Sequence, residues 1–278
     1  MKIPRTAVLA LAASLSSSVT AFSLNTAGRS FVTRSSNSAF QHSTKHILPS
    51  SLNRASPRTS SGLNMFFGNL FGGGAIEAPI DYTALDHPGP ELGKAASEGK
   101  VLVTSERDPN LQVATFAGGC FWGLELAYQR VPGVVYTAVG YTQGTEENPT
   151  YGQVCSGATG HTEAVCVYYD PNECTYEQLL DTFFDRVNPT TVNGQGNDFG
   201  KQYRTGVYTH TEEQKKLAKA CFEREQTQHK KRIATELKDA MPFWPAEKYH
   251  QQYLEKGGRS GMPQNAAKGA KETIRCYG

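Results

Sequence analysis

Residues 111–130 read LQVATFAGGCFWGLELAYQR and contain a predicted strand, a turn and a predicted helix. Residues 111–116 alternate Leu, Val and the β-prone Thr with Gln and Ala, which is typical of a strand. Residues 124–130 place Leu, Ala and Tyr on one side of a helix, and Pro132 stops it. Cys120 therefore lies where a strand leads into a helix.

The position of Cys120 leaves two interpretations of its thiol. At a helix start, unpaired backbone N–H groups and the positive end of the helix dipole favour a thiolate, and the neighbouring glycines let a substrate approach the sulfur. On composition alone, however, a free cysteine beside Phe121 and Trp122 is more often a small buried hydrophobe. Residue types by themselves do not choose between a nucleophile and a packing residue.

The segments that follow predict more strands and helices in alternation. Capping-box patterns, with Thr followed three residues later by Gln, open both predicted helices. The predicted strands are 134–141, 161–169, 203–208 and 233–237, and the predicted helices are 176–187 and 212–230. This order predicts an α+β fold, a two-layer sandwich with a βαβ, ferredoxin-like mixed-sheet core and an irregular C-terminal tail.

The first 64 residues have the composition of a two-part leader. Residues 1–21 carry Lys2 and Arg5 before a short apolar run, as in a signal peptide, and the run is too short to span a bilayer. Residues 22–64 are rich in Ser, Thr, Asn and Arg without any acidic residue, as in an organelle transit peptide. Signal plus transit predicts a plastid bounded by extra membranes; the alternative is a secreted protein with a Ser-rich linker.

The rest of the chain is predicted to be an arm and one catalytic domain. Residues 65–100 contain several prolines and read as an extended N-terminal arm, with at most a short helix near 91–97. The catalytic domain is expected over 101–278, with a mobile tail from about residue 256, where the chain becomes Gly-rich and loses periodicity. No heptad or long exposed apolar stripe is evident, so a monomer is expected.

Composition narrows the class of function. The formal net charge is +2, which gives no sign of a nucleic-acid partner. The six cysteines are too sparse for a disulfide scaffold and lack zinc-site spacing, and His161 with Cys166 does not form such a site. There is no Gly-rich nucleotide fingerprint either. We therefore expect no metal and no bound cofactor, and reducing equivalents that arrive through thiols.

Gly119-Cys120-Phe121-Trp122-Gly123 resembles the signature of the peptide methionine sulfoxide reductase A family. Further family-like motifs follow in the expected order, and the resemblance, to the plant and algal plastid type, runs from about residue 113 to 278. These motifs are Gly140-Tyr141-Thr142, Gly160-His161-Thr162-Glu163-Ala164-Val165, Gln195-Gly196-Asn197-Asp198 and Gln202-Tyr203-Arg204.

The resemblance implies an enzyme that reduces the S epimer of methionine sulfoxide in proteins and peptides, with the free amino acid as a further substrate. Cys120 is implied to attack the sulfur and Glu163 to donate a proton, since desolvation in a strand would raise the pKa of its carboxyl. In the family pattern the oxygen is bound by two tyrosines and an aspartate, and an aromatic pair surrounds the methyl group. The matching residues here are Tyr141, Tyr203, Asp198, Phe121 and Trp122.

The resemblance also implies how the enzyme is recycled. Cys120 becomes a sulfenic acid, Cys276 resolves it as a disulfide, and a dithiol reductant such as thioredoxin reduces that disulfide. Plant-type members commonly carry a further cysteine where this chain has Ala270, which suggests a single relay. Phe199 stands where many bacterial relatives have His, and we expect tuning at most. Cys155 matches a family cysteine that is usually structural.

Two other functions use the same residues. A cysteine hydrolase or acyltransferase would pair Cys120 with a histidine, for which His161 is the candidate, and would survive Glu163→Gln. A catalytically inert module would bind oxidised or Met-rich partners without turnover. The remaining cysteines, Cys166, Cys174 and Cys221, are expected to be packing residues, with Cys174 at a helix start the least certain.

Overall fold

The computed structural model describes residues 78–276. The predicted signal peptide (1–21), the transit segment (22–64) and the first part of the arm (65–77) lie outside the described residues. Across 78–276, no helix combines the length and the apolar character needed to cross a bilayer. The described residues belong to one compact unit, which includes the second part of the arm.

A six-stranded mixed sheet forms the centre of the fold, with the strand order β7-β6-β1-β3-β2-β8. β1 runs antiparallel to both β3 and β6, and β3 runs antiparallel to β2. β1 and β2 are therefore parallel with β3 between them, and β3 and β6 are parallel with β1 between them. These are two split βαβ units, which confirms the predicted ferredoxin-like core. Its elements are β1 (Gln112–Gly118), α2 (Phe121–Gln129), β2 (Val134–Thr142), β3 (Thr162–Tyr169), α4 (Tyr176–Arg186) and β6 (Thr205–Thr209).

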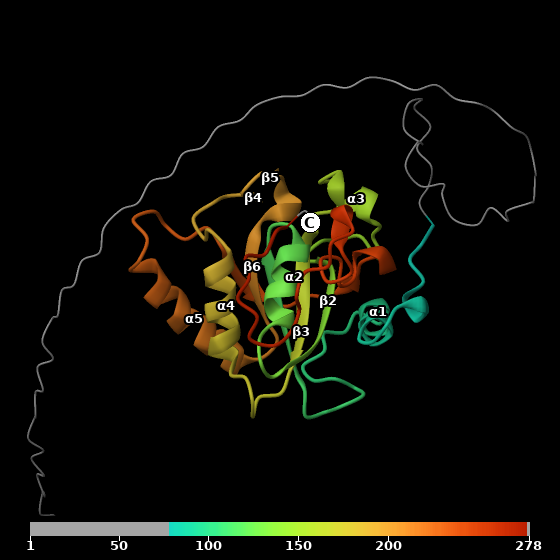
Figure 1. Cartoon of the computed structure of the whole chain (residues 1–278), viewed down its shortest axis with the longest axis horizontal. Coiled ribbons are helices and arrows are strands. Elements are labelled where there is room, and N and C mark those ends of the chain that lie inside the picture. The colour runs from blue at the N-terminus through green and yellow to red at the C-terminus, as the bar shows by residue number, and fades with distance from the viewer. Residues whose placement is uncertain (1–77, 277–278) are drawn as a thin grey trace, which may run out of the picture. The chain divides into compact units, whose positions relative to one another are not determined.

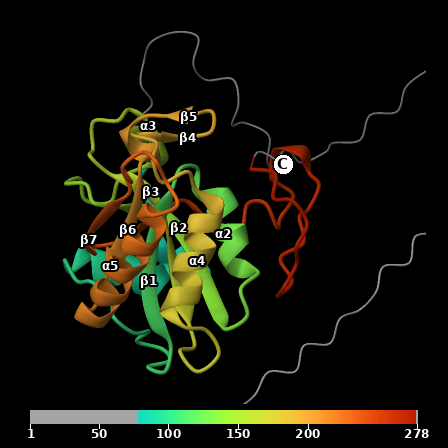
Figure 2. The ribbon, with the colours of Figure 1, turned by 90° about the vertical axis from the view of Figure 1, so that its left-hand side faces the viewer.

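Two further strands extend this core at its edges. α5 (Glu212–Gln226) connects β6 to the parallel strand β7 (Glu236–Asp239), and β8 (Trp244–Pro245) pairs antiparallel with β2 at the other edge. Helices α2, α4 and α5 lie together on one face of the sheet, as Figures 1 and 2 show. The helix predicted over 212–230 ends earlier, at Gln226, whose side chain donates to the carbonyls of His229 and Lys231 in the turn that follows.

Both faces of the sheet are buried. Ala114 and Phe116 of β1 point into the core under the helices, whereas Val113 and Ala117 point into a second core on the opposite face. Leu92 belongs to that second core, and it lies on α1 (Gly89–Ser97) of the N-terminal arm. The arm therefore covers the face that the three large helices leave open, which explains why the strand residues of both alternating sets are apolar.

Two stretches between the long elements contain short elements that matter for the site. Residues 142–152 lead into α3 (Tyr151–Cys155), where Thr150 and Gln153 form a complete capping box. Residues 188–201 contain a hairpin of β4 (Gly194–Gln195) and β5 (Asp198–Phe199). α3, β4 and β5 are too short to be recognised from a periodic pattern in the sequence.

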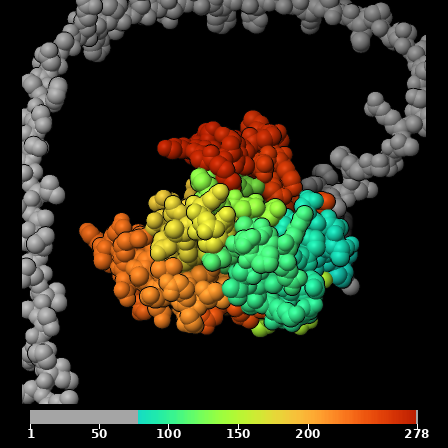
Figure 3. Space-filling model, turned by 90° about the horizontal axis from the view of Figure 1, so that it is seen from below, coloured from blue at the N-terminus to red at the C-terminus, as the bar shows by residue number. Residues whose placement is uncertain are grey.

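The C-terminal segment is irregular, as predicted, and it is anchored to the end of α2. Arg130 donates to the carbonyls of Asn265 and Glu272 at 2.8 and 2.6 Å. Lys268 donates to the carbonyls of Gln129 and Val134 at 2.7 and 2.5 Å. In Figures 2 and 3 this red segment lies beside α2 and forms a lobe on the surface. The predicted mobility of this tail stays a prediction.

Candidate active site

Cys120 occupies the N-cap position of α2, directly after β1. The preceding Gly119 has φ +79°, and a Cβ on it would come 2.6 Å from the Cβ of Gln195. A side chain at 119 would therefore be strained and would collide with the β4–β5 hairpin. The glycine lets this hairpin close over the strand-to-helix turn, which gives Cys120 the predicted position at a helix start.

The electrostatics of Cys120 differ from the expected thiolate-favouring environment. Burial raises the pKa of the Cys120 thiol well above its usual range, and the negative charge of Glu163 raises it further. The backbone N–H of Trp122 opposes this shift but does not outweigh it. Desolvation is the stronger effect because a helix terminus contributes only a partial charge. The resting residue is therefore a thiol.

Glu163 is the buried carboxyl of the site. It lies in β3 opposite Tyr141 of β2, and it is only 2% exposed. Its Oε2 accepts a hydrogen bond of 3.1 Å from the backbone N–H of Phe121, the first residue of α2. Burial raises the pKa of Glu163 to about 8, so the group carries a proton at neutral pH. The raised pKa is in the direction expected from the position of Glu163 in an apolar strand.

The Glu163 carboxyl and the Cys120 thiol form a coupled pair of acids. Each charge disfavours the other, so the pair does not readily lose both protons. When Glu163 is protonated, its contribution to the high pKa of Cys120 disappears. A neutral Glu163 thus both supplies a proton and removes the repulsion that disfavours a Cys120 thiolate.

Tyr203 and Asp198 belong to the same electrostatic cluster. Tyr203 ends the short 3-10 helix η2 (Lys201–Tyr203), and burial together with Glu163 raises the pKa of its hydroxyl, to which Asp198 and Cys120 also contribute. Asp198 lies on β5 opposite Gln195 and contributes to the raised pKa of Glu163. The hairpin and the η2 turn therefore bring both predicted residues to Cys120.

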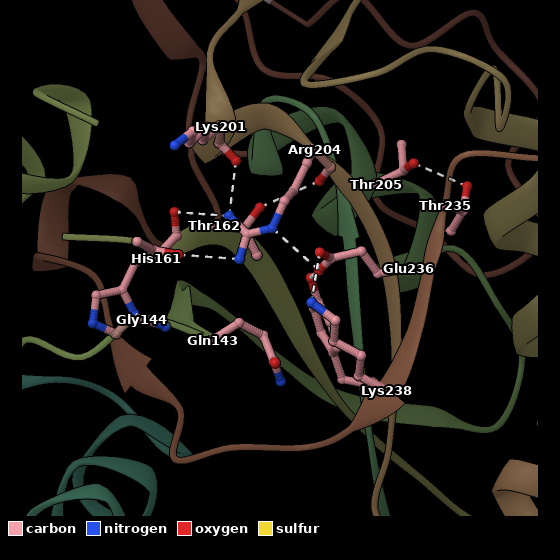
Figure 4. A network of polar contacts seen from close by, with 12 residues as sticks. Gln143, Gly144, His161, Thr162, Lys201, Arg204, Thr205, Thr235, Glu236 and Lys238 are labelled. Atoms are coloured by element: carbon pink, nitrogen blue, oxygen red, sulfur yellow. Dashed lines mark hydrogen bonds and ion pairs between the residues drawn. The ribbon is translucent and has the colours of Figure 1, made fainter. Parts of the chain in front are cut away.

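Arg204 fixes the two backbone segments that carry Tyr203 and Glu163. Its guanidinium donates to the Lys201 carbonyl at 2.8 Å, to the His161 carbonyl at 3.2 Å and to the Gly160 carbonyl at 3.1 Å. Its Nε also bonds the Glu236 carboxylate at 3.1 Å. Figure 4 shows these bonds converging on Arg204 from separate elements. The arginine thereby ties the η2 turn to the entry of β3.

The hydroxyl of Tyr141, which is predicted to bind the sulfoxide oxygen, is bound to a carboxylate in this structure. Its hydroxyl donates a 3.0 Å hydrogen bond to Glu247 Oε2, and Glu247 Oε1 accepts the backbone N–H of Tyr151 at 2.8 Å. A phenol has one proton, so Tyr141 must release Glu247 before it can donate to a substrate oxygen. Glu247 was given no role from the sequence, since nothing in its own segment distinguishes it from a surface carboxylate.

An aromatic cluster lies beside the nucleophile. Phe121 is fully buried and its ring lies 6.1 Å from those of Trp122 and Tyr141. Trp122 stacks on Tyr253 with a centroid distance of 4.0 Å and an angle of 20°. Phe121 and Trp122 therefore begin an aromatic wall, and Tyr253 and His250 of the segment after β8 extend it.

His250 is the residue of this cluster that sequence reasoning missed. Its ring centroid lies 5.3 Å from that of Phe121 and 5.6 Å from that of Trp122. Burial lowers the pKa of His250 to about 3, so it stays neutral. His161, in contrast, binds the Gly144 N–H and the Glu146 carbonyl with its two ring nitrogens. Neither histidine is suited to be the base of a cysteine hydrolase.

Cys276 lies against α2. A Cβ on Gly123 would come 2.7 Å from Cys276 Sγ, and Cys276 also contributes to the raised pKa of Cys120. All six cysteines are free thiols in this structure. Cys155 is half-buried and hydrogen-bonded to the Tyr151 side chain. The buried cysteines are the predicted packing residues Cys166, Cys174 and Cys221.

The β4–β5 hairpin also carries Phe199, which departs from the family pattern. Phe199 is 78% exposed on β5 beside Asp198, so the departure from the family pattern lies at the surface. Among residues 78–276, no group of three or more His, Cys, Asp or Glu side chains is arranged to hold a metal ion. The site thus consists of two thiols, a protonated carboxyl, phenols and an aromatic wall.

Comparison with known proteins agrees with this arrangement. The sequence profile described as peptide methionine sulfoxide reductase matches residues 112–275. Peptide methionine sulfoxide reductase A3 of Arabidopsis thaliana is 59% identical over 170 residues, which are 61% of this chain and 84% of that protein. The chloroplastic A4 protein of the same plant is 57% identical over 167 residues, 60% of this chain and 65% of its own length.

Solved structures show the same relationship. Reduced Mxr1 from Saccharomyces cerevisiae is 39% identical with a TM-score of 0.51, covering 54% of this chain and 88% of that one. Methionine sulfoxide reductase A of Corynebacterium diphtheriae is 33% identical with a TM-score of 0.50, covering 56% of this chain and 85% of that one. The chain therefore belongs to the peptide methionine sulfoxide reductase family and is an enzyme that reduces peptide methionine sulfoxide.

Proposed function

We propose that this enzyme reduces the S epimer of methionine sulfoxide through a sulfenic acid on Cys120. The Cys120 sulfur attacks the sulfoxide sulfur as the thiol releases its proton to solvent, and the oxygen takes the proton of Glu163, which regains one from solvent afterwards. Methionine then leaves, and Cys120 keeps the oxygen as a sulfenic acid. Substrates are methionine sulfoxides in proteins and peptides, with the free amino acid as an additional substrate.

The observation that supports this mechanism best is the protonated, buried Glu163 at the first turn of α2. Its carboxyl bonds the N–H of the residue next to Cys120, so it is fixed beside the nucleophile. A carboxyl with a pKa of about 8 holds its proton at neutral pH and gives it up to a developing oxyanion. A solvated surface carboxylate would be ionised and unable to do this.

The polar groups around the oxygen have separate roles in this proposal. Tyr203 donates to the sulfoxide oxygen, and Asp198 orders the polar side of the site. Tyr141 holds the Glu247 carboxylate in the resting enzyme and turns its proton to the oxygen when substrate enters. Phe121 and Trp122 surround the substrate methyl group, which the aromatic cluster keeps away from water.

Recycling proceeds through one relay. The thiol of Cys276 attacks the Cys120 sulfenic acid to give a disulfide and water, and a dithiol protein of the thioredoxin type reduces that disulfide. Ala270 lies in the anchored tail next to Gly269, whose N–H donates to the Arg130 carbonyl. With alanine at position 270, no second internal exchange is available at that point. We propose that the enzyme acts as a monomer.

We propose the plastid as the place of action. The acid-free, basic composition of residues 22–64 and the signal-like residues 1–21 support import through a two-part leader. The chloroplastic name of the A4 relative, which is 57% identical, is consistent with it. The function there is repair of methionine oxidised in plastid proteins.

Epimer-resolved turnover tests the proposed function. We expect the mature chain to reduce dabsylated methionine S-sulfoxide with dithiothreitol or thioredoxin, and to leave the R epimer unchanged. The hydrogen-bond donors and the aromatic wall have fixed positions, so they can bind the oxygen and the methyl group of only one configuration at sulfur. Chiral chromatography of the products measures both reactions. Equal reduction of the two epimers would contradict the proposed substrate geometry, and no reduction of either would contradict the reaction.

A further inference from the structure

The last glycine of the Gly119–Gly123 motif, Gly123, lies against the side chain of Cys276. Gly123 lies in the first turn of α2, three residues after the N-cap Cys120. A Cβ built on it would lie 2.7 Å from Cys276 Sγ and 3.8 Å from Cys276 Cβ. Real Cβ atoms do not approach sulfur so closely, so any side chain at 123 would displace Cys276.

The position of Gly123 relative to Cys120 suits disulfide formation. Gly123 is the third residue of α2 counted from the N-cap Cys120, and an N-cap side chain points toward the backbone of the second and third helix residues. A disulfide needs Cβ atoms about 3.8 Å apart, so the resolving thiol has to be held beside this turn of the helix, which is where Cys276 lies against Gly123. Cys276 also contributes to the raised pKa of the Cys120 thiol.

The tail is held so that Cys276 arrives at this place. The Gln264 side chain bonds both backbone groups of Arg275, accepting its N–H at 2.9 Å and donating to its carbonyl at 2.7 Å. Gln264 is itself buried, and its N–H donates to the Leu254 carbonyl at 3.0 Å. The residue before Cys276 is thus fixed to the body of the domain, while Arg130 anchors the middle of the tail at the other end of α2.

We propose that Gly123 is the seat of the resolving thiol. The absence of a side chain at this position lets Cys276 rest against α2, one turn from Cys120, so the disulfide forms without a search by the tail. Gln264 is the positioning residue that delivers Cys276 to the seat. This inference rests on the proposed function, because it concerns the step after methionine leaves.

Formation of the disulfide needs only the atoms and electrons of the two cysteines. Cys120 carries S–OH and Cys276 carries S–H; the Cys276 sulfur attacks the Cys120 sulfur, an S–S bond forms and the S–O bond breaks. The oxygen leaves as water with its own proton and the thiol proton of Cys276. Cys120 is reduced from the sulfenic level and Cys276 is oxidised to the disulfide, so no external oxidant or reductant takes part.

Gly123→Ala separates the two half-reactions. Mixed with excess substrate and no reductant, the wild-type enzyme should release one methionine and lose two thiols. The variant should still release methionine, while its second thiol disappears about 10-fold to 100-fold more slowly, since a displacement of about 1 Å can cost that much. Dimedone should label its Cys120. Thiol titration, methionine chromatography and mass spectrometry on the same samples measure these outcomes.

Stability is an internal control, because alanine favours a helix more than glycine does. A slower second step with an unchanged or higher melting temperature therefore locates the defect in the seat. Gln264→Ala leaves the sequence of α2 unchanged and should slow the same step. It is the second test variant, to be used if Gly123→Ala does not fold. Disulfide formation at the wild-type rate in both variants would overturn the proposal. Absence of methionine from the wild-type enzyme would overturn the proposed function beneath it.

Discussion

Glu163→Gln is expected to lower the single-turnover rate of methionine formation by about 10²–10⁴-fold, the usual contribution of a general acid. The glutamine amide can still accept the Phe121 N–H that bonds Glu163 Oε2 at 3.1 Å, so the position of α2 should be kept. It cannot give a proton to the departing oxygen. Rapid-quench measurement of methionine release, without a reductant, isolates this step from recycling.

The pH dependence of the same rate provides a second signature. The pKa of Glu163 is about 8, and the reaction needs the protonated form. The wild-type rate should therefore fall as the pH rises through about 8, and this falling limb should be absent from the residual activity of Glu163→Gln. A variant that keeps wild-type activity would show that another group donates the proton.

Glu125→Gln is the matched control. Glu125 is also buried, and burial raises its pKa to about 8 as well, but its carboxylate bonds Thr137 and the backbone N–H of Gln252 rather than the residues at Cys120. We expect this variant to react at a rate within a few-fold of wild type. Loss of activity in both variants would point to a shared structural effect.

Thermal stability checks both carboxyls. A group with a pKa raised from 4.5 to about 8 in the folded state stabilises the protein fully below about pH 4.5, and this contribution is lost as the pH rises to about 8. Each glutamine variant should therefore gain in melting temperature relative to wild type between pH 5 and pH 9. The sign follows because the folded state then holds more protons than the unfolded one.

The order of the larger elements was predictable from the sequence because their patterns are long. β1, β2 and β3 follow runs of at least six mostly strand-forming residues, and α4 follows a capping box and an apolar helix face. Their order allows few topologies, and the ferredoxin-like arrangement follows from right-handed βαβ crossovers. The covering of the second face by α1 was harder to predict, because among the described arm residues Leu92 alone belongs to that core and the arm is Pro-rich.

Site residues were predictable from the sequence where their residue type is unusual in its local segment. They were less predictable where only the fold brings distant segments together. Glu163 in an apolar strand and Cys120 at a helix start are unusual locally. Glu247 and His250 are not unusual in their segment, and only the fold brings them to Tyr141 and Phe121. The pKa of Cys120 depends on burial by distant segments, so its local helix start indicated the opposite direction.

Cys276→Ser is expected to abolish turnover with thioredoxin, to less than about one hundredth of the wild-type rate, while turnover with dithiothreitol continues. Without Cys276, the oxidised sulfur stays on Cys120, which lies under the β4–β5 hairpin and beside the aromatic wall. A small dithiol can enter this site, whereas a folded protein must bring its own thiolate to the sulfur it attacks. The relay moves the reducible sulfur to the tail at the surface.

Steady-state assays with each reductant and one substrate epimer measure this difference. The matched control is Cys155→Ser, since Cys155 is also half-buried near the site but its thiol is hydrogen-bonded to the Tyr151 side chain. This control should keep thioredoxin-driven turnover. If Cys276→Ser still cycled with thioredoxin and Cys155→Ser did not, α3 rather than the tail would carry the resolving thiol. A wild-type rate in both variants would mean that thioredoxin attacks the Cys120 sulfenic acid directly.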